Sequence, residues 1–313
     1  MTRTITHSDE VRHRYEQVLE RASVQSRYVR MNAGEQVHVL EGGDGPPLVL
    51  LHGSGASAWF FLPLLTELNG FRVIAPDRPS QGLSDPIDLP RSDYYGRSIG
   101  WLDRLFDALE LDSAALLGHS AGGVLALRYT LARPSRIERL VLIGPPGLPG
   151  TRCPLPYRFM ATPGVGELLS RLAPPSPKSM LRFAKFMGEE GTLANHPDLV
   201  DLFVAAARDE LAVSGTTAEV RMLVSPFALL SRYGFRRQSQ VRLDELRRLT
   251  VPTLLAWGDK EPLGDVTVAR TVVDLIPRAQ LQVLPGGHAP WLGHPTETAT
   301  AVAEFVNQER TQA

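Results

Sequence analysis

Cysteine is nearly absent from the sequence, and its scarcity excludes two kinds of structure. The chain has 313 residues and a single cysteine, Cys153. One thiol cannot form an internal disulfide, and it leaves no basis for a cysteine-ligated metal site. Because Cys153 lies between Arg152 and Pro154 in a segment predicted to be a loop, we interpret it as an incidental thiol and not as a nucleophile.

An excess of one charge and long apolar runs are also lacking. The chain has 33 Lys and Arg against 34 Asp and Glu, so it has no strong overall electrostatic field that would attract nucleic acid or an anionic membrane surface. No apolar run approaches the roughly 20 residues that cross a bilayer. The polar segment 1–30 lacks the apolar core of a signal peptide. We expect a cytoplasmic protein with a small-molecule substrate, no nucleic-acid partner and no membrane span; the oligomeric state stays open.

Cofactor and metal motifs are missing as well. The first predicted parallel strand is followed by His52-Gly53-Ser54-Gly55, which matches neither the dinucleotide-binding pattern nor the phosphate-binding P-loop. Six of the histidines lack metal-ligand spacing: His7, His13, His38, His119, His196 and His294. We therefore expect no metal, flavin or nicotinamide cofactor.

Short apolar runs that alternate with helix-length segments make up most of the sequence. Such runs are typical of strands buried on both faces of a sheet. They occupy 47–51, 72–75, 114–117, 140–143, 253–256 and 281–284. Helices are predicted at 94–109 and 121–131, and a hairpin at 28–39. This order predicts an α/β fold with a mainly parallel, twisted sheet flanked by helices.

The alternation stops at residues 145–243, where helix-like stretches at 179–187, 197–212 and 217–233 occur without a convincing strand. We predict a helical cap there, inserted into a core of residues 27–144 and 244–313, after an N-terminal polar arm or helix at 1–26. Apolar cap residues could line a pocket or form the cap's own core. They are Phe183, Phe186, Met187, Phe203, Met222 and Phe227.

Gly118-His119-Ser120-Ala121-Gly122 satisfies the pattern G-x-S-x-G between a predicted buried strand and a predicted helix. This context is the one that a nucleophile elbow requires. The tight turn leaves no room for side chains at Gly118 and Gly122, and it exposes the Ser120 hydroxyl above the sheet. Ser120 is therefore the candidate nucleophile.

The order of elements and motifs resembles the α/β-hydrolase fold family over about residues 27–306, and four segments carry the resemblance. The first is His52-Gly53-Ser54-Gly55, at the position where the family forms half of its oxyanion hole. The resemblance implies that the backbone N–H groups of Ser54 and Ala121 stabilise the oxyanion. It leaves His52 a structural role.

The second segment, 77–85, is similar to the D-x-x-G-x-G-x-S loop that supports the nucleophile region in this family. Ser80 replaces the first glycine of that pattern, so the loop could differ in conformation. We expect a structural role for the loop and assign no catalytic function to Asp77 or Asp85.

The third and fourth segments supply the partners of the nucleophile. His288, in Pro285-Gly286-Gly287-His288 after the last predicted strand, occupies the position of the family's catalytic histidine. The segment 256–262 resembles the family's W-G-x-x-D-P stretch, and in this register Glu261 takes the place of the usual aspartate. The family accepts Asp or Glu as the triad acid. Asp259 is the alternative acid.

A serine nucleophile favours acyl transfer, so the resemblance implies hydrolysis of a small to medium carboxylic ester. The pocket candidates are Trp59, Phe183, Phe227 and Trp291. One alternative is carbon–carbon bond hydrolysis of a β-diketone or meta-cleavage product. Residues 52–59 are similar to the oxyanion segment of those hydrolases, which usually carry a cap arginine; Arg232, Arg236 and Arg237 are candidates. Another alternative is a non-hydrolytic ligand-binding or cofactor-free lyase member of the fold.

Overall fold

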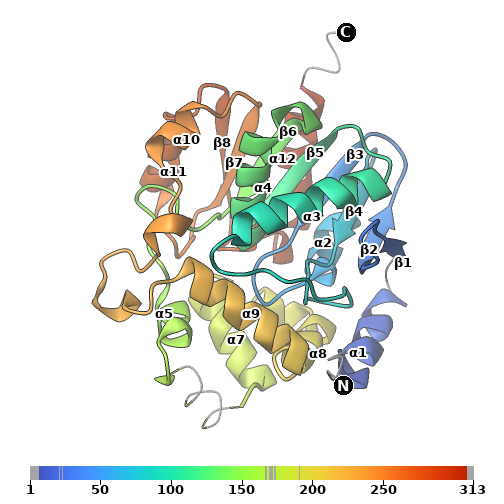
Figure 1. Cartoon of the computed structure of the whole chain (residues 1–313), viewed down its shortest axis with the longest axis vertical. Coiled ribbons are helices and arrows are strands. Elements are labelled where there is room, and N and C mark those ends of the chain that lie inside the picture. Colours follow the sequence, from blue (N-terminus) through green and yellow to red (C-terminus); the bar gives the residue numbers. More distant parts are fainter. Residues whose placement is uncertain are drawn as a thin grey trace.

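The computed structural model describes residues 7–308, except residues 21, 23, 166, 167, 169–171, 173 and 190. Its centre is an eight-stranded sheet with the strand order β1-β2-β4-β3-β5-β6-β7-β8 (Figure 1). β2 pairs antiparallel with β1 and β4, and all other pairs are parallel. The strands are β1 (Gln25–Arg30), β2 (Gln36–Gly42), β3 (Pro47–Leu51), β4 (Arg72–Pro76), β5 (Ala114–His119), β6 (Ile137–Ile143), β7 (Thr253–Gly258) and β8 (Ala279–Leu284).

The apolar runs predicted as buried strands correspond to β3 through β8. Every side chain of β5 and β7 is buried, because both lie inside the sheet and helices cover both of its faces. The predicted hairpin is formed by β1 and β2, in whose register Val29 faces Val37. The α/β fold class inferred from the alternating pattern is confirmed.

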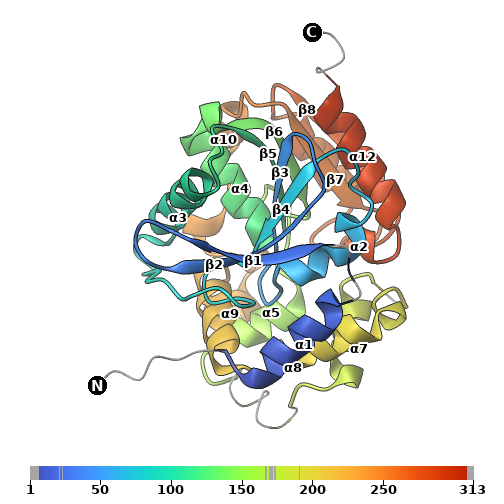
Figure 2. The ribbon, with the colours of Figure 1, turned by 90° about the vertical axis from the view of Figure 1, so that its right-hand side faces the viewer.

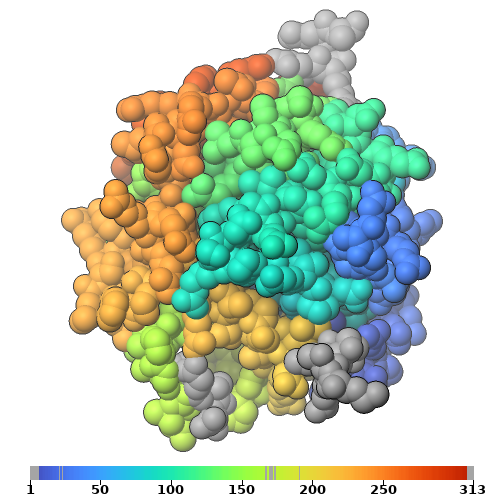
Figure 3. Space-filling model, viewed as in Figure 1, coloured from blue at the N-terminus to red at the C-terminus, as the bar shows by residue number. Residues whose placement is uncertain are grey.

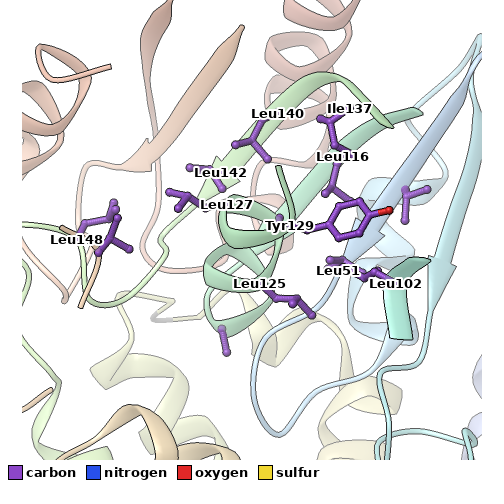
Figure 4. Packing of buried hydrophobic residues seen from close by; sticks show 14 of the residues in the cluster. Leu51, Leu102, Leu116, Leu125, Leu127, Tyr129, Ile137, Leu140, Leu142 and Leu148 are labelled. Carbon is purple, nitrogen blue, oxygen red and sulfur yellow. The ribbon is translucent and has the colours of Figure 1, made fainter. Parts of the chain in front are cut away.

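Helices enclose two apolar cores, one on each face of the sheet. α3, α4, α10 and α11 cover one face, and α2 and α12 cover the other (Figures 1 and 2). Figure 4 shows part of the first core, where Leu102 and Tyr129 of the helices lie near Leu51 and Leu116 of the sheet. None of the described helices is long and apolar enough to cross a membrane. These helices are α2 (Leu62–Leu65), α3 (Tyr94–Ala108), α4 (Ala121–Ala132), α10 (Leu243–Arg247), α11 (Val266–Val273) and α12 (Pro295–Asn307).

Residues 145–243, which we call the cap, contain the helices between β6 and α10. The predicted helices at 197–212 and 217–233 are wrong in their ends. Asp209 separates α8 from α9 because its carboxylate caps α9, accepting from the Ala212 N–H at 2.8 Å. α9 ends at Leu223, after which the chain turns back and Val224 pairs with Phe235. In the part of the cap that the structure describes, the α-helices are α5 (Leu155–Ala161), α7 (Pro177–Phe186), α8 (Pro197–Ala206) and α9 (Glu210–Leu223). The division of the chain into arm, core and cap stays a prediction.

The N-terminal helix α1 (Asp9–Leu19) contacts both the core and the cap. Its buried Tyr15 donates a hydrogen bond to Asp77 of the core at 3.1 Å. Just before the helix, the Ser8 N–H donates to the Asp209 carboxylate at 2.7 Å, and His7 Nδ1 lies 2.9 Å from the same carboxylate. α1 also packs along α8. The part of segment 1–26 that the structure describes therefore lies against the body of the protein.

The loop of residues 77–85 is organised around the buried Asp77 carboxylate. This carboxylate accepts hydrogen bonds from His38 Nδ1 at 2.8 Å, the Ala58 N–H at 2.7 Å and the Leu83 N–H at 2.8 Å. Burial acts to raise the pKa of Asp77, but its interaction with His38 and these hydrogen bonds outweigh burial and lower it. Ser80, which replaces a glycine of the family pattern, has φ of 62° and so adopts a backbone conformation that favours glycine.

Gly82 in this loop is expected to be intolerant of any side chain. Its φ is +56°, and a Cβ there would overlap the Asp77 carboxylate. We expect Gly82→Ala to lower the free energy of unfolding by roughly 2–4 kcal/mol, as measured by chemical denaturation. Gly34→Ala is the matched control, because φ is +99° there but a Cβ would meet no atom within 4 Å. It should cost only about 1 kcal/mol. Equal costs would show that Asp77 yields to the new methyl group.

Candidate active site

The candidate residues follow strands that end at the same edge of the sheet. Ser54 follows β3, Ser120 follows β5, Glu261 follows β7 and His288 follows β8. Because these strands are parallel, their carboxyl ends lie side by side, where open α/β sheets bind their ligands. The topology thus brings together groups that lie far apart in the sequence.

Ser120 occupies a strained turn between β5 and α4. Its φ of 52° and ψ of −124° lie outside the helix and strand regions, and its N–H donates to the Ile143 carbonyl at 2.9 Å. A Cβ at Gly118 would lie 2.6 Å from the Gly122 carbonyl oxygen, and one at Gly122 would overlap Leu51 and His52. The glycines of the motif are required because strand, turn and helix pack in direct contact, as the elbow geometry predicts.

His288 and Glu261 form a buried pair beside Ser120. His288 Nδ1 lies 2.9 Å and 3.0 Å from the two carboxylate oxygens of Glu261. Since a carboxylate only accepts, Nδ1 carries the proton of this hydrogen bond and Nε2 is left as an acceptor when the ring is neutral. Gly144, with φ of +53°, provides the space: a Cβ there would lie 2.6 Å from Glu261 Oε2 and 2.8 Å from His288 Nδ1. No sequence pattern indicated that Gly144 leaves the space for the Glu261 and His288 side chains.

Asp259, the alternative acid, faces away from this pair. Its side chain is exposed, and its Oδ1 accepts a hydrogen bond from the Gly286 N–H at 2.9 Å. Glu261, by contrast, is buried and also accepts from the Leu263 N–H at 3.1 Å. The geometry therefore joins Glu261, and not Asp259, to His288.

The loop of Gly53, Ser54 and Gly55 packs directly on the elbow. A Cβ at Gly53 would lie 2.9 Å from the Ser120 Cβ. In the described part of the chain, the N–H groups of Ser54 and Ala121 make no hydrogen bond to another protein group. His52 is held apart from the chemistry, since its Nε2 accepts from the Arg78 N–H at 2.9 Å. Burial lowers the pKa of His52 to about 3, so the ring is neutral.

Two small apolar hollows meet at Ser120 and His288. The larger, of about 70 Å³, is lined by Phe60, Phe183, Phe203 and Leu292, among others. The smaller, of about 30 Å³, reaches Val220, Leu223, Phe235 and Leu263. Tyr157 and Met187 line both. Met187 and Phe203 were among the cap residues that the sequence suggested could line a pocket, whereas Tyr157 was missed.

Only one of the four pocket candidates, Phe183, lines these hollows. Trp59 is buried behind the larger hollow and packs edge-on against Phe203, with ring centroids 4.5 Å apart. Trp291 is also buried, and its indole N–H donates to the Phe60 carbonyl at 2.8 Å. Phe227 is 71% exposed on the loop after α9. The structure does not bring these three residues to Ser120.

Cations and metal-ligand clusters are lacking around Ser120 in the described residues. No arginine lines either hollow: Arg232 stacks on the ring of Tyr233, and Arg236 and Arg237 line a separate outer hollow with Phe227. No group of three or more His, Cys, Asp or Glu residues in the described ranges could hold a metal. Cys153 lines the smaller hollow, and burial raises the pKa of its thiol to about 12. A thiol with so high a pKa is protonated at neutral pH, which disfavours Cys153 as a nucleophile.

A buried ion pair lies next to Ser54. Glu219 of α9 receives two hydrogen bonds from Arg78, at 2.5 Å and 3.0 Å, and one from the Tyr94 hydroxyl at 2.8 Å. Its Oε2 also accepts from Ser54 Oγ at 2.6 Å. Burial acts to raise the pKa of Glu219, but Arg78 outweighs burial and lowers it to about 2. Glu219 is thus ionised. Its helix, α9, packs directly against α3 and the loop before it (Figure 3).

Comparisons with known proteins agree with the fold and with the family that the sequence motifs indicate. A sequence model described as the alpha/beta hydrolase fold matches residues 46–295. The chain is 29% identical to a 2-hydroxy-6-oxononadienedioate/2-hydroxy-6-oxononatrienedioate hydrolase of Cupriavidus pinatubonensis, over 85% of this chain and 90% of that protein. It is 28% identical to a pimeloyl-acyl-carrier-protein methyl ester esterase of a Shewanella species, over 87% and 95%. Naproxen esterase from Bacillus subtilis matches with a TM-score of 0.71 at 23% identity, over 96% and 99%. The chain belongs to the α/β hydrolase fold family and is a hydrolase of that fold.

Proposed function

We propose that the protein cleaves a small to medium carboxylic ester through an acyl-enzyme on Ser120. His288 acts as the general base and acid, Glu261 orients it, and the N–H groups of Ser54 and Ala121 form the oxyanion hole. The observation that carries the proposal is the buried His288–Glu261 pair, which lies beside Ser120 at the junction of two apolar hollows.

The proposed reaction has two halves. Ser120 Oγ attacks the ester carbonyl carbon while His288 Nε2 takes the hydroxyl proton, and the two N–H groups stabilise the resulting oxyanion. Collapse of this intermediate breaks the carbon–oxygen bond, and His288 gives its proton to the leaving alcohol. Water then attacks the acyl-enzyme, again with His288 as base, and releases the acid and Ser120. No cofactor or metal enters any step.

The lining of the hollows supports an ester over the carbon–carbon bond alternative. One relative is named for a substrate that is a dicarboxylate, and such a substrate needs a cation in the site. No arginine or lysine of the described residues lines either hollow beside Ser120. An apolar acyl group, in contrast, needs only apolar surface. Carbon–carbon bond hydrolysis stays the second candidate because of that relative.

A fluorophosphonate probe tests the proposal directly, since it reacts only with an activated serine. We expect one probe to bind per chain, at Ser120, and the folded Ser120→Ala variant to stay unlabelled. The cavity of about 70 Å³ is smaller than the roughly 150 Å³ that holds benzene. Of a series of p-nitrophenyl esters, the acetate and butyrate should therefore have a higher kcat/KM than the octanoate. Absence of labelling in the folded wild type would refute the proposal.

A further inference from the structure

Two buried carboxylates of the cap contact the loops that carry the proposed catalytic groups. Glu219 lies on α9 and Glu189 follows α7; their side chains are almost completely enclosed. The proposed chemistry uses neither of them. Each is bonded to a core loop that follows a different strand of the sheet, Glu219 to the loop after β3 and Glu189 to the loop after β8.

Glu219 restrains the Ser54 loop, residues 53–55, through a hydrogen bond to the Ser54 side chain. Ser54 Oγ donates to Glu219 Oε2 at 2.6 Å, while Arg78 and Tyr94 fix the other positions around the same carboxylate. The Ser54 loop is rich in glycine, and Gly55 has φ of +73°, so its own backbone restricts it weakly. The hydrogen bond to Glu219 is therefore a restraint on the orientation of the Ser54 N–H.

Glu189 restrains the His288 loop, residues 287–289, through hydrogen bonds from the backbone of that loop to the Glu189 carboxylate. Its Oε1 accepts from the Gly287 N–H at 3.0 Å and from the Ala289 N–H at 2.8 Å, on the two sides of His288. Its Oε2 accepts from Thr192 Oγ1 at 2.9 Å, which fixes the carboxylate within the cap. The His288 N–H itself donates to the Met187 carbonyl of the cap at 2.9 Å. Three consecutive N–H groups of the histidine loop thus bind the cap.

We propose that Glu219 and Glu189 are positioning residues through which the cap sets the oxyanion hole and the catalytic histidine. The cap then does more than shape the substrate cavity: its docking assembles the two catalytic loops in their working geometry. Misplacement of a reacting group by about 1 Å can cost a hundred-fold in rate, so small movements of either loop have large effects. The inference rests on the proposed function.

Ser54→Ala gives the cleanest test, because it keeps the backbone N–H that would bind the oxyanion and removes only the hydrogen bond to Glu219. We expect kcat for p-nitrophenyl butyrate to fall by about ten- to hundred-fold, with KM changed by less than about three-fold. Ser54→Thr keeps a hydroxyl and should recover most of the rate. In the Ser54→Ala background, Glu219→Ala should reduce kcat no further, because both changes remove the same hydrogen bond.

Glu189 is tested by a pair of variants. Glu189→Ala removes the acceptor of two loop N–H groups and should lower kcat by about ten-fold or more, whereas Glu189→Gln retains an acceptor oxygen and should keep most of the activity. Asp209→Asn is the matched control. Asp209 is a buried cap carboxylate bonded to Ser8, His7 and Ala212 and to no catalytic loop, so its variant should keep wild-type kcat even if its stability falls.

The outcomes separate this inference from the proposed function. A wild type that binds the fluorophosphonate probe, combined with unchanged kcat in both Ser54→Ala and Glu189→Ala, would overturn the positioning role alone. A wild type that does not bind the probe would overturn the proposed function and this inference with it. A loss of activity in Asp209→Asn equal to that in Glu189→Ala would show that any damage to the cap is enough, and would also contradict the inference.

Discussion

Glu261→Gln should lower kcat by about four orders of magnitude. Glu261 accepts the Nδ1 hydrogen bond of His288 with both carboxylate oxygens, at 2.9 Å and 3.0 Å, and this holds Nε2 as an acceptor for the Ser120 proton. The amide of glutamine presents N–H donors and so favours the opposite tautomer, in which Nε2 carries the proton and cannot act as a base. Steady-state kinetics with an activated ester give the rate, and thermal unfolding shows that the variant is folded.

Two further variants decide which carboxylate is the acid. Asp259→Asn keeps the oxygen that accepts from the Gly286 N–H, and we expect its activity to stay near that of the wild type. Glu261→Asp keeps the charge on a shorter side chain and should have intermediate activity. A large loss in Asp259→Asn, together with an active Glu261→Gln, would instead assign the acid to Asp259.

Glu219→Gln should lower the free energy of unfolding by about 3–5 kcal/mol. Arg78 is 4% exposed and is paired with Glu219 by two hydrogen bonds, so the variant leaves a buried cation without its counter-charge. The double variant Arg78→Met/Glu219→Leu removes both charges and should recover most of the stability. Urea denaturation measures both. Equal instability of the single and double variants would show that the loss comes from packing and not from charge.

The same pair predicts how this contribution depends on pH. Arg78 lowers the pKa of Glu219 from 4.5 to about 2, and a carboxylate whose pKa is lowered by folding stabilises the folded state above its unfolded-state pKa. The contribution is lost as the pH falls toward the folded-state value. Urea denaturation should therefore show an acid-induced loss in the wild type between about pH 4.5 and pH 2, and this component should be absent from the double variant.

The sheet and the elbow could be predicted from the sequence because local patterns encode them. Apolar runs of strand length reveal β3 to β8, and Gly118 and Gly122 are required by close backbone contacts within the strand–turn–helix unit and its neighbouring strand. Glu261 and His288 were predicted from the resemblance of the segments after the last two strands to motifs of the α/β-hydrolase family, and the structure joins them. Their catalytic roles, like those of Ser120, Ser54 and Ala121, stay proposals.

The cap contacts could not be predicted, because no local pattern encodes which cap residue meets which core loop. Ser54 and Glu219 are 165 residues apart, and Glu189 and Gly287 are 98 apart. Nothing in the sequence around either glutamate distinguishes it from a solvated carboxylate. Phe227 shows the opposite difficulty, because an aromatic residue in the cap suggests a pocket, whereas the turn after α9 leaves it in solvent.

Helix α1 has a mechanical consequence for how a substrate reaches Ser120. The polypeptide crosses between core and cap near α5 and α10, and α1 lies at the opposite side of the molecule (Figure 1). There Tyr15 is hydrogen-bonded to Asp77 in the loop after β4, and Ser8 to Asp209 of the cap. A cap attached to the core at one side only could rotate about that attachment. The contacts of α1 with both core and cap on the other side oppose such a rotation. We therefore expect a substrate to reach the hollows by local displacement of side chains between core and cap, with the cap as a whole staying in place.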